Sequence, residues 1–184
     1  MKFISLVAVT LAFGISCSKQ PQSRPAPAQS PTTAIGTQTL TGRVVTIADG
    51  DTITVLDATE TQHRIRLAGI DAPELHQAFG NQSKQSLSEM IFGRDVTVSY
   101  QKIDQYGRIV GKILLDGRDI NLEQIKAGMA WHYKYYENEQ TQEDRQGYAS
   151  AEEDARAARR GLWQDPNPIE PYEFRKEEKG ANGR

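Results

Sequence analysis

The clearest hydrophobic pattern in the chain is the alternation of apolar and polar residues between positions 62 and 70. His63, Ile65 and Leu67 fall on one face of an extended strand, and Arg64 and Arg66 fall on the other. Ile65 and Leu67 are the natural core pair. The pattern therefore predicts a half-buried strand from which Arg66 points away from the core.

Four further β-rich segments are predicted to be strands. They cover residues 39–48, 51–56, 95–103 and 108–115. The first two are separated by Asp49-Gly50, a dipeptide typical of a tight hairpin turn. The last two are joined by a turn at 104–107.

Apolar residues at helical spacing predict three helices. These cover residues 81–92, 121–127 and 145–160. The first places Leu87, Met90 and Ile91 on one side, and the second begins with an Asn-x-x-Gln pattern typical of a helix N-terminus. A helix inserted between the third and fourth of five strands predicts a mainly β, α+β fold. We expect a five-stranded Greek-key barrel of the OB type with three helices.

Composition divides the chain into four parts. Residues 1–16 carry an early Lys2 and an apolar run of signal-peptide length, which is too short to span a bilayer. Residues 17–37 are rich in Pro, Gln, Ser and Thr and are predicted to be a disordered tether. Residues 38–163 form one domain with enough apolar residues for a core, and residues 164–184 are predicted to be a flexible charged tail.

Cys17 is the only cysteine, so the chain has no intramolecular disulfide. Its position at the end of the apolar run resembles a bacterial lipoprotein cleavage site, where the cysteine is lipidated. Gly14 departs from the usual leucine of that site, so an ordinary signal peptide is the alternative. Both interpretations predict an exported protein, either anchored to a membrane of the bacterial envelope or secreted or periplasmic. No oligomer interface is indicated, so a monomer is expected.

The predicted domain is acidic. Residues 38–163 contain 15 Lys and Arg against 19 Asp and Glu, a net charge of −4. A tight, non-specific nucleic-acid binder needs a basic surface, so the charge argues against that class. An enzyme that holds its substrate through a local cation and a few arginines is not excluded.

Three short motifs carry candidate chemistry, each at a turn or strand end where polar groups can converge. They are Asp49-Gly50-Asp51-Thr52, Arg66-Leu67-Ala68-Gly69-Ile70-Asp71-Ala72-Pro73-Glu74 and Asp104-Gln105-Tyr106-Gly107-Arg108. Their carboxylates suit a hard divalent cation, and their arginines suit a phosphate. The combination predicts metal-assisted phosphodiester hydrolysis.

Each motif also has a purely structural interpretation. Asp49-Gly50 is a turn sequence, the segment from Asp71 to Glu74 matches a helix capping box, and the segment from Asp104 to Arg108 alone is a hairpin loop. The joint occurrence of the motifs, in this order and on these elements, favours the chemical interpretation.

These motifs, with the closing Gly161-Leu162-Trp163, resemble the thermonuclease, or staphylococcal-nuclease-like, family over the whole domain. The segment 64–74 and Gly128-Met129-Ala130-Trp131 resemble its common bacterial branch. The resemblance implies an OB-fold barrel and a Ca²⁺-dependent endonuclease that acts on DNA and RNA. It also implies that the 5′-oxygen is expelled and that 3′-phosphate ends remain.

The resemblance implies a role for each site residue. The implied calcium ligands are Asp51, Asp71 and the main-chain carbonyl of Ala72. Glu74 is implied to activate or orient the attacking water. Arg66 and Arg108 are implied to hold the phosphate and neutralise its transition state.

Aromatic residues lie within the third motif and in a run at 131–136. Family members stack a base on tyrosines in this region, which makes Tyr106, Tyr133 and Tyr136 candidate substrate-binding residues. Trp131 and Trp163 are predicted to be core residues. A non-catalytic OB-fold protein of the cell envelope that binds single-stranded nucleic acid is the main alternative to a nuclease. A lipoprotein that uses the barrel as a scaffold is a third hypothesis, with no specific sequence support.

Overall fold

The computed structural model of the chain describes residues 36–182. The predicted signal peptide, Cys17 and nearly all of the predicted tether lie outside the described residues. Within residues 36–182, no helix combines the length and apolar character needed to cross a bilayer.

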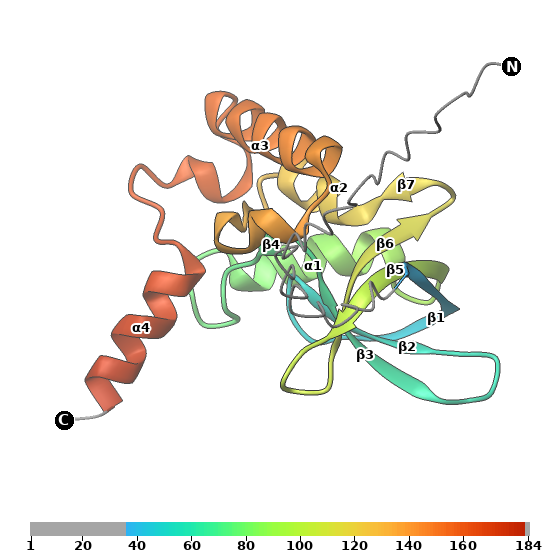
Figure 1. The fold of residues 1–184 in the computed structure, drawn as a ribbon. Helices are drawn as coiled ribbons and strands as arrows, with labels where there is room; N and C mark the ends of the chain where they lie inside the picture. Colours follow the sequence, from blue (N-terminus) through green and yellow to red (C-terminus); the bar gives the residue numbers. More distant parts are fainter. Residues whose placement is uncertain (1–35, 183–184) are drawn as a thin grey trace, which may run out of the picture. The chain divides into compact units, whose positions relative to one another are not determined.

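Five strands close into a barrel (Figure 1). They are β1 (Gln38–Ile47), β2 (Thr52–Leu56), β3 (Gln62–Leu67), β5 (Asp95–Ile103) and β6 (Ile109–Leu115). Neighbours in the order β3-β2-β1-β5-β6 are antiparallel, and a parallel pairing between β3 and β6 closes the ring. The five-stranded OB-type barrel predicted from the sequence is confirmed.

Buried and more exposed residues alternate along β3, as the sequence predicts. Ile65 and Leu67 are buried in the barrel, whereas Arg66 between them is only half-buried. The same period-two burial recurs along β6, where Ile109, Ile113 and Leu115 point inward. The barrel interior is therefore filled by side chains, and the polar groups of β3 are left for the outer face and the strand ends.

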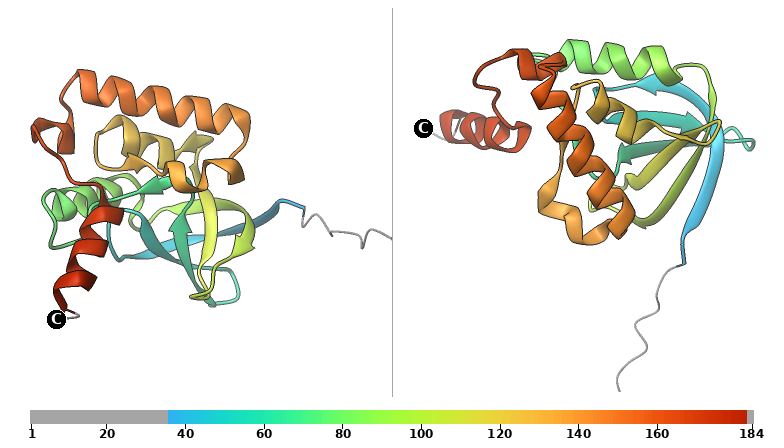
Figure 2. Two further views of the ribbon diagram at one scale, coloured as in Figure 1. Left: turned by 60° about the vertical axis from the view of Figure 1, so that its left-hand side comes forward. Right: turned by 90° about the horizontal axis from the view of Figure 1, so that it is seen from above.

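Three helices cover the barrel and match the predicted ones. They are α1 (Gly80–Ile91), α2 (Ile120–Lys126) and α3 (Gln142–Ala157). Figure 2 shows α3 lying across α2 on one side of the barrel. Leu87 of α1 and Tyr148 of α3 both join the main core. Trp131 packs edge-on against Trp163 with ring centroids 4.4 Å apart, so both tryptophans are core residues as predicted.

Several short elements complete the fold. They are β4 (Ile70–Asp71), β7 (Arg118–Asp119), β8 (Trp131–His132), the 3₁₀ turns η1 (Lys134–Glu139) and η2 (Gly161–Gln164), and a final helix α4 (Pro171–Asn182). The strands β4 and β8 form their own small antiparallel ladder, in which Asp71 is opposite Trp131. This ladder brings the aromatic segment next to the second motif.

Helix α2 starts earlier than its Asn-x-x-Gln pattern predicts. Asp119 is the N-cap and accepts a hydrogen bond from the Leu122 N–H at 3.0 Å. Asn121 is instead fully buried, where it accepts from the Ile113 N–H and donates to the Ala68 carbonyl. Its side chain is used to join strand ends, which is why it is not available as a cap.

Two further local predictions differ from the structure. The capping-box interpretation of residues 71–74 is wrong, because Asp71 lies in β4 and the next helix begins only at Gly80. The segment 164–184, predicted to be a flexible tail, contains helix α4. This helix starts at Pro171, a residue well suited to the first turn, and packs Phe174 and Arg175 against the domain.

Candidate active site

The turn between β1 and β2 places Asp51 at the end of the barrel. Gly50 is required there because a Cβ atom at this position would lie 1.9 Å from the Ser83 Oγ atom of α1. The Gly50 carbonyl accepts a hydrogen bond from the buried Gln124 side chain of α2 at 2.9 Å. The two helices therefore fix the backbone from which the Asp51 carboxylate projects.

Arg66 joins the first two motifs. Its Nη1 atom lies 2.9 Å from Asp51 Oδ2, and its Nη2 atom lies 2.9 Å from Asp71 Oδ1. The side chains of Asp51 and Asp71 are only 9% and 3% exposed. A single guanidinium thus holds two buried carboxylates together, which a compact lysine ammonium could not do with the same two-pronged geometry.

Asp51 is further anchored to the second motif through the backbone. The Ala72 N–H donates to Asp51 Oδ2 at 2.7 Å. Burial raises the pKa of Asp51 to about 7, and the nearby Asp49 and Asp71 add to this rise while Arg66 opposes it. The pair of buried carboxylates is therefore a place where an added cation gains strongly from electrostatic attraction.

Glu74 lies in the turn that follows β4. Its backbone N–H donates to the Gln77 side chain at 3.1 Å, and its carbonyl accepts from the Gln77 N–H at 2.9 Å. The chain passes so close to Gly80 that a Cβ atom there would lie 1.8 Å from the Glu74 carbonyl oxygen. The turn is tightly constrained, and the Glu74 carboxylate remains about a third exposed.

Arg108 lies at the start of β6 and is held by its own loop. Its Nε atom donates to Asp104 Oδ2 at 2.8 Å, and its backbone N–H donates to Asp104 Oδ1 at 2.9 Å. Tyr106 packs against the Arg108 guanidinium, 5.4 Å from ring centroid to Cζ. The parallel pairing of Ile109 with Ile65 puts this loop beside the strand that carries Arg66. The described contacts do not pair Arg108 with Asp51, Asp71 or Glu74.

The candidate base-stacking tyrosines lie in and just before η1. Tyr133 is anchored by its N–H, which donates to the Gly69 carbonyl at 2.9 Å. Burial, and next the charge of Asp71, raise the pKa of Tyr133. Tyr136 packs edge-on against Tyr133 with centroids 5.3 Å apart and carries the Lys102 ammonium 5.0 Å from its ring centre.

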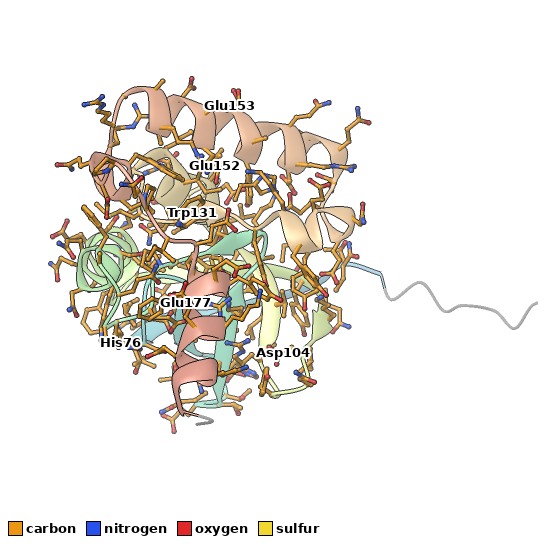
Figure 3. The ribbon with its side chains drawn as sticks, turned by 90° about the vertical axis from the view of Figure 1, so that its left-hand side faces the viewer. His76, Asp104, Trp131, Glu152, Glu153 and Glu177 are labelled. Carbon is orange, nitrogen blue, oxygen red and sulfur yellow. The ribbon has the colours of Figure 1, made fainter. Side chains whose placement is uncertain are left out.

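One residue of the site, Arg175, was not predicted from the sequence. Arg175 of α4 donates to Asp71 Oδ2 at 2.9 Å and to Glu74 Oε1 at 2.8 Å. Figure 3 shows α4 crossing in front of the barrel, with His76 on one side of it and Asp104 on the other. The only sequence signal was a Pro-Tyr-Glu-Phe-Arg run, which places two aromatic residues in a tail that is otherwise charged.

The donor set fits a calcium ion. Asp51 and Asp71 supply two buried carboxylates whose oxygens converge on one guanidinium, and hard oxygen donors are what calcium prefers. Within residues 36–182 no group of three His, Cys, Asp or Glu side chains is arranged to hold a metal. A bound calcium would therefore need main-chain oxygen, such as the Ala72 carbonyl, and water to complete its coordination.

Comparison with known proteins identifies a family and several relatives. Residues 64–165 match the model of the staphylococcal nuclease homologue family. The chain is 43% identical over 139 residues to an uncharacterized endonuclease of Haemophilus influenzae, covering 76% of this chain and 75% of the relative. It is 42% identical over 149 residues to a micrococcal nuclease of Shigella flexneri, covering 76% of this chain and 83% of the relative. It is also 39% identical over 147 residues to the protein ParB of Escherichia coli, with 75% and 80% covered.

Proposed function

Because the chain belongs to the staphylococcal nuclease family, we propose that it is an endonuclease that hydrolyses phosphodiester bonds of DNA and RNA with the help of Ca²⁺. The observation that carries the proposal is the convergence of Asp51 and Asp71 on Arg66. Two buried carboxylates and a bidentate arginine at one point suit a cation and a phosphate together.

Each residue of the site has its own proposed chemical role. Asp51, Asp71 and the Ala72 carbonyl would hold the calcium, which supplies positive charge to the phosphate and acidity to a bound water. Glu74, the one carboxylate of the group with substantial exposure, accepts the proton of the attacking water. The water oxygen bonds to phosphorus while the bond from phosphorus to the 5′-oxygen breaks. The departing 5′-oxygen takes up a proton from solvent, which leaves a 3′-phosphate end and a 5′-hydroxyl end.

The arginines stabilise the charge that grows on the phosphate. Arg66 is fixed between two carboxylates, so its orientation is set before substrate arrives, as efficient electrostatic catalysis requires. Arg108 gives its Nε–H to Asp104, and we propose that its terminal Nη groups donate to a phosphate oxygen. Tyr106, Tyr133 and Tyr136 are the proposed surface for the bases, because stacking tolerates any sequence.

The experiment that tests this function is digestion of plasmid DNA and of RNA by the purified protein, with Ca²⁺ or with a chelator. We expect both substrates to be cut with Ca²⁺ and neither with chelator. Binding of single-stranded nucleic acid without any cleavage would favour the non-catalytic OB-fold alternative. If the protein neither binds nor cleaves nucleic acid, the scaffold hypothesis is favoured. Sizing of the same sample by light scattering tests the expected monomer.

For localisation, we propose export and a lipid anchor on Cys17, a residue outside the described part of the chain. The support is the apolar run that ends at the only cysteine. Cells expressing the parent or the Cys17→Ala protein are fractionated and the mature sizes compared. The anchor predicts that the parent sediments with membranes and that the variant does not. Soluble partitioning of both forms at one mature size would favour an ordinary cleaved signal peptide.

A further inference from the structure

The C-terminal helix α4 inserts the positively charged side chain of Arg175 into the candidate active site. The Arg175 guanidinium binds Asp71 with both prongs, Nη2 to Oδ2 at 2.9 Å and Nη1 to Oδ1 at 3.2 Å. Nη1 also donates to Glu74 Oε1 at 2.8 Å. Arg175 thus binds one proposed calcium ligand and the proposed proton acceptor at the same time.

These contacts occupy most of the acceptor capacity of Asp71 that a metal would need. A carboxylate offers about four lone-pair positions. On Asp71, Oδ1 already accepts from both Arg66 and Arg175, and Oδ2 accepts from Arg175. A divalent cation beside this guanidinium would also meet like-charge repulsion in a poorly solvated site. Arg175 and a calcium ion therefore compete for the same carboxylate.

Helix α4 is held over the site by contacts on both sides of Arg175. The Gln77 side chain donates to the Ile169 carbonyl at 2.7 Å, just before the helix. His76 contacts Phe174 with ring centroids 5.2 Å apart and pairs with Glu178 at 2.7 Å. The position of Arg175 is therefore supported by the turn that carries Glu74, which contains both Gln77 and His76.

Helix α4 also contacts the aromatic segment that carries Tyr133 and Tyr136. Tyr172 lies parallel to Tyr135 with ring centroids 6.3 Å apart and planes 16° apart, and Tyr135 in turn packs edge-on against Tyr136. The Tyr172 ring therefore lies next to the surface proposed for bases, while the Arg175 guanidinium binds the carboxylates. Helix α4 thus contacts the carboxylates directly and the tyrosine surface through Tyr135.

We propose that α4 is an autoinhibitory helix, and that calcium binding and α4 docking oppose each other through Asp71. The inference rests on the proposed function, because it takes Asp71 as a calcium ligand. When calcium and substrate bind, Arg175 and Tyr172 leave the site and the helix is released. By linkage, whatever weakens α4 docking strengthens calcium binding, and calcium weakens α4 docking by the same factor.

The docking is suited to release. The side chains of His76 and Glu178 are 60% and 42% exposed, and an ion pair with such exposure contributes little net stability. The helix is 12 residues long, a length at which an isolated helix is marginal in water. Release therefore costs little once a calcium ion replaces Arg175 as the positive charge beside the buried Asp71.

The direct test is calcium titration by calorimetry of the parent, Arg175→Gln and Lys176→Gln. Lys176 is the matched control, because it lies next in the helix, is 69% exposed and pairs with Glu173 on the helix itself. The proposal predicts that Arg175→Gln lowers the calcium Kd by at least about 5-fold, the lower end of typical coupling, and that Lys176→Gln leaves it unchanged. Thermal melts establish that each variant is folded.

A second variant separates helix docking from the loss of a local charge. His76→Ala removes an α4 contact without touching Asp71 or Glu74, and it should also lower the calcium Kd. In the parent, hydrogen exchange of the α4 amides should speed up when calcium is added, whereas exchange in the barrel strands should not. Both readouts are independent of nuclease activity.

The outcomes are distinguishable. If no form binds calcium, both the calcium site and this inference fail. If the parent and Arg175→Gln bind calcium equally, the autoinhibitory helix is overturned while the calcium site stands. If Arg175→Gln instead weakens binding of a nucleotide bisphosphate and slows cleavage, Arg175 is a third phosphate-binding arginine, which also overturns the inference.

Discussion

The Ala72 N–H donates to the Asp51 carboxylate at 2.7 Å, across 21 positions of sequence. This one hydrogen bond joins the turn after β1 to the segment after β4, so the first two motifs form a single structure. Ala72 makes this contact through its backbone N–H, so the contact needs no functional side chain at position 72.

Replacing either carboxylate should abolish calcium binding. Asp51→Asn and Asp71→Asn each keep the side-chain shape but remove half of the buried negative charge that a cation would meet. Calorimetric titration with calcium should show no binding for either variant. Asp116→Asn is the control, because Asp116 is 80% exposed and its left-handed backbone (φ 52°) also suits asparagine. Calcium binding by Asp51→Asn and Asp71→Asn at parent affinity would show that the metal lies elsewhere.

Arg66→Lys should lower the turnover of nucleic acid by about 10² to 10³, the effect of losing one charge-stabilising donor, or ~3–4 kcal/mol. It should also destabilise the fold, because a lysine cannot bond both Asp51 and Asp71 and leaves a buried carboxylate poorly compensated. Turnover and thermal melts are measured together. Arg64→Lys, at an exposed position two residues earlier in the same strand, should change neither.

Arg108→Lys should separate these two effects. Arg108 pairs with the half-buried Asp104 at the rim of the barrel, so a lysine keeps most of the charge interaction and the melt should stay close to that of the parent. Turnover should still fall by about 10² or more, because the two-pronged contact with phosphate is lost. A parent-like rate would mean that Arg108 only stabilises its own loop through Asp104.

Glu74→Gln should stop catalysis without unfolding the protein. Glu74 does not cap a helix, so the substitution removes only the charge of its partly exposed pairing with Arg175 and should change the melt little. Glutamine cannot accept the proton of the attacking water, so turnover should fall by at least about 10². Glu89→Gln, on the exposed side of α1, is the matched control. Unchanged turnover in Glu74→Gln would assign water activation to another group.

Asp57→Asn should destabilise the hairpin between β2 and β3 in a pH-dependent way. Hydrogen bonds from His63, and then from Thr59 and the Thr61 N–H, lower the pKa of Asp57 well below its usual range. A lowered folded-state pKa adds stability above the unfolded value of about 3.9, and this stability is lost as the pH falls further. Thermal melts should therefore separate parent and variant at neutral pH and converge in acid.

The control for the hairpin is Asp95→Asn, since Asp95 is 76% exposed and makes only a 3.6 Å ion pair with Arg43. It should track the parent at every pH. A difference between Asp57→Asn and parent that is constant from neutral pH to acid would show that the charge of Asp57 is not what the hairpin uses.

The sequence by itself determined the local elements and the motif chemistry. Period-two burial in β3, Asp-Gly and Gly-Arg turns, and apolar helical spacing are properties of neighbouring residues, so they can be read without the fold. The side of the strand that carries Arg66 follows from the same alternation. Asp51, Asp71 and Glu74 were predicted as site residues from the joint occurrence of three short motifs and their resemblance to one family.

Only the tertiary structure decided which of these groups meet. Gln124 reaches the Gly50 carbonyl from 74 residues away, and Arg175 reaches Asp71 from 104 residues away. Such long-range partners depend on how the packed elements approach one another. Local periodicity contains no information about that approach. A capping pattern at Asp71 and a charged tail around Arg175 were locally reasonable interpretations, and long-range pairing of β4 with β8 and docking of α4 overrode them.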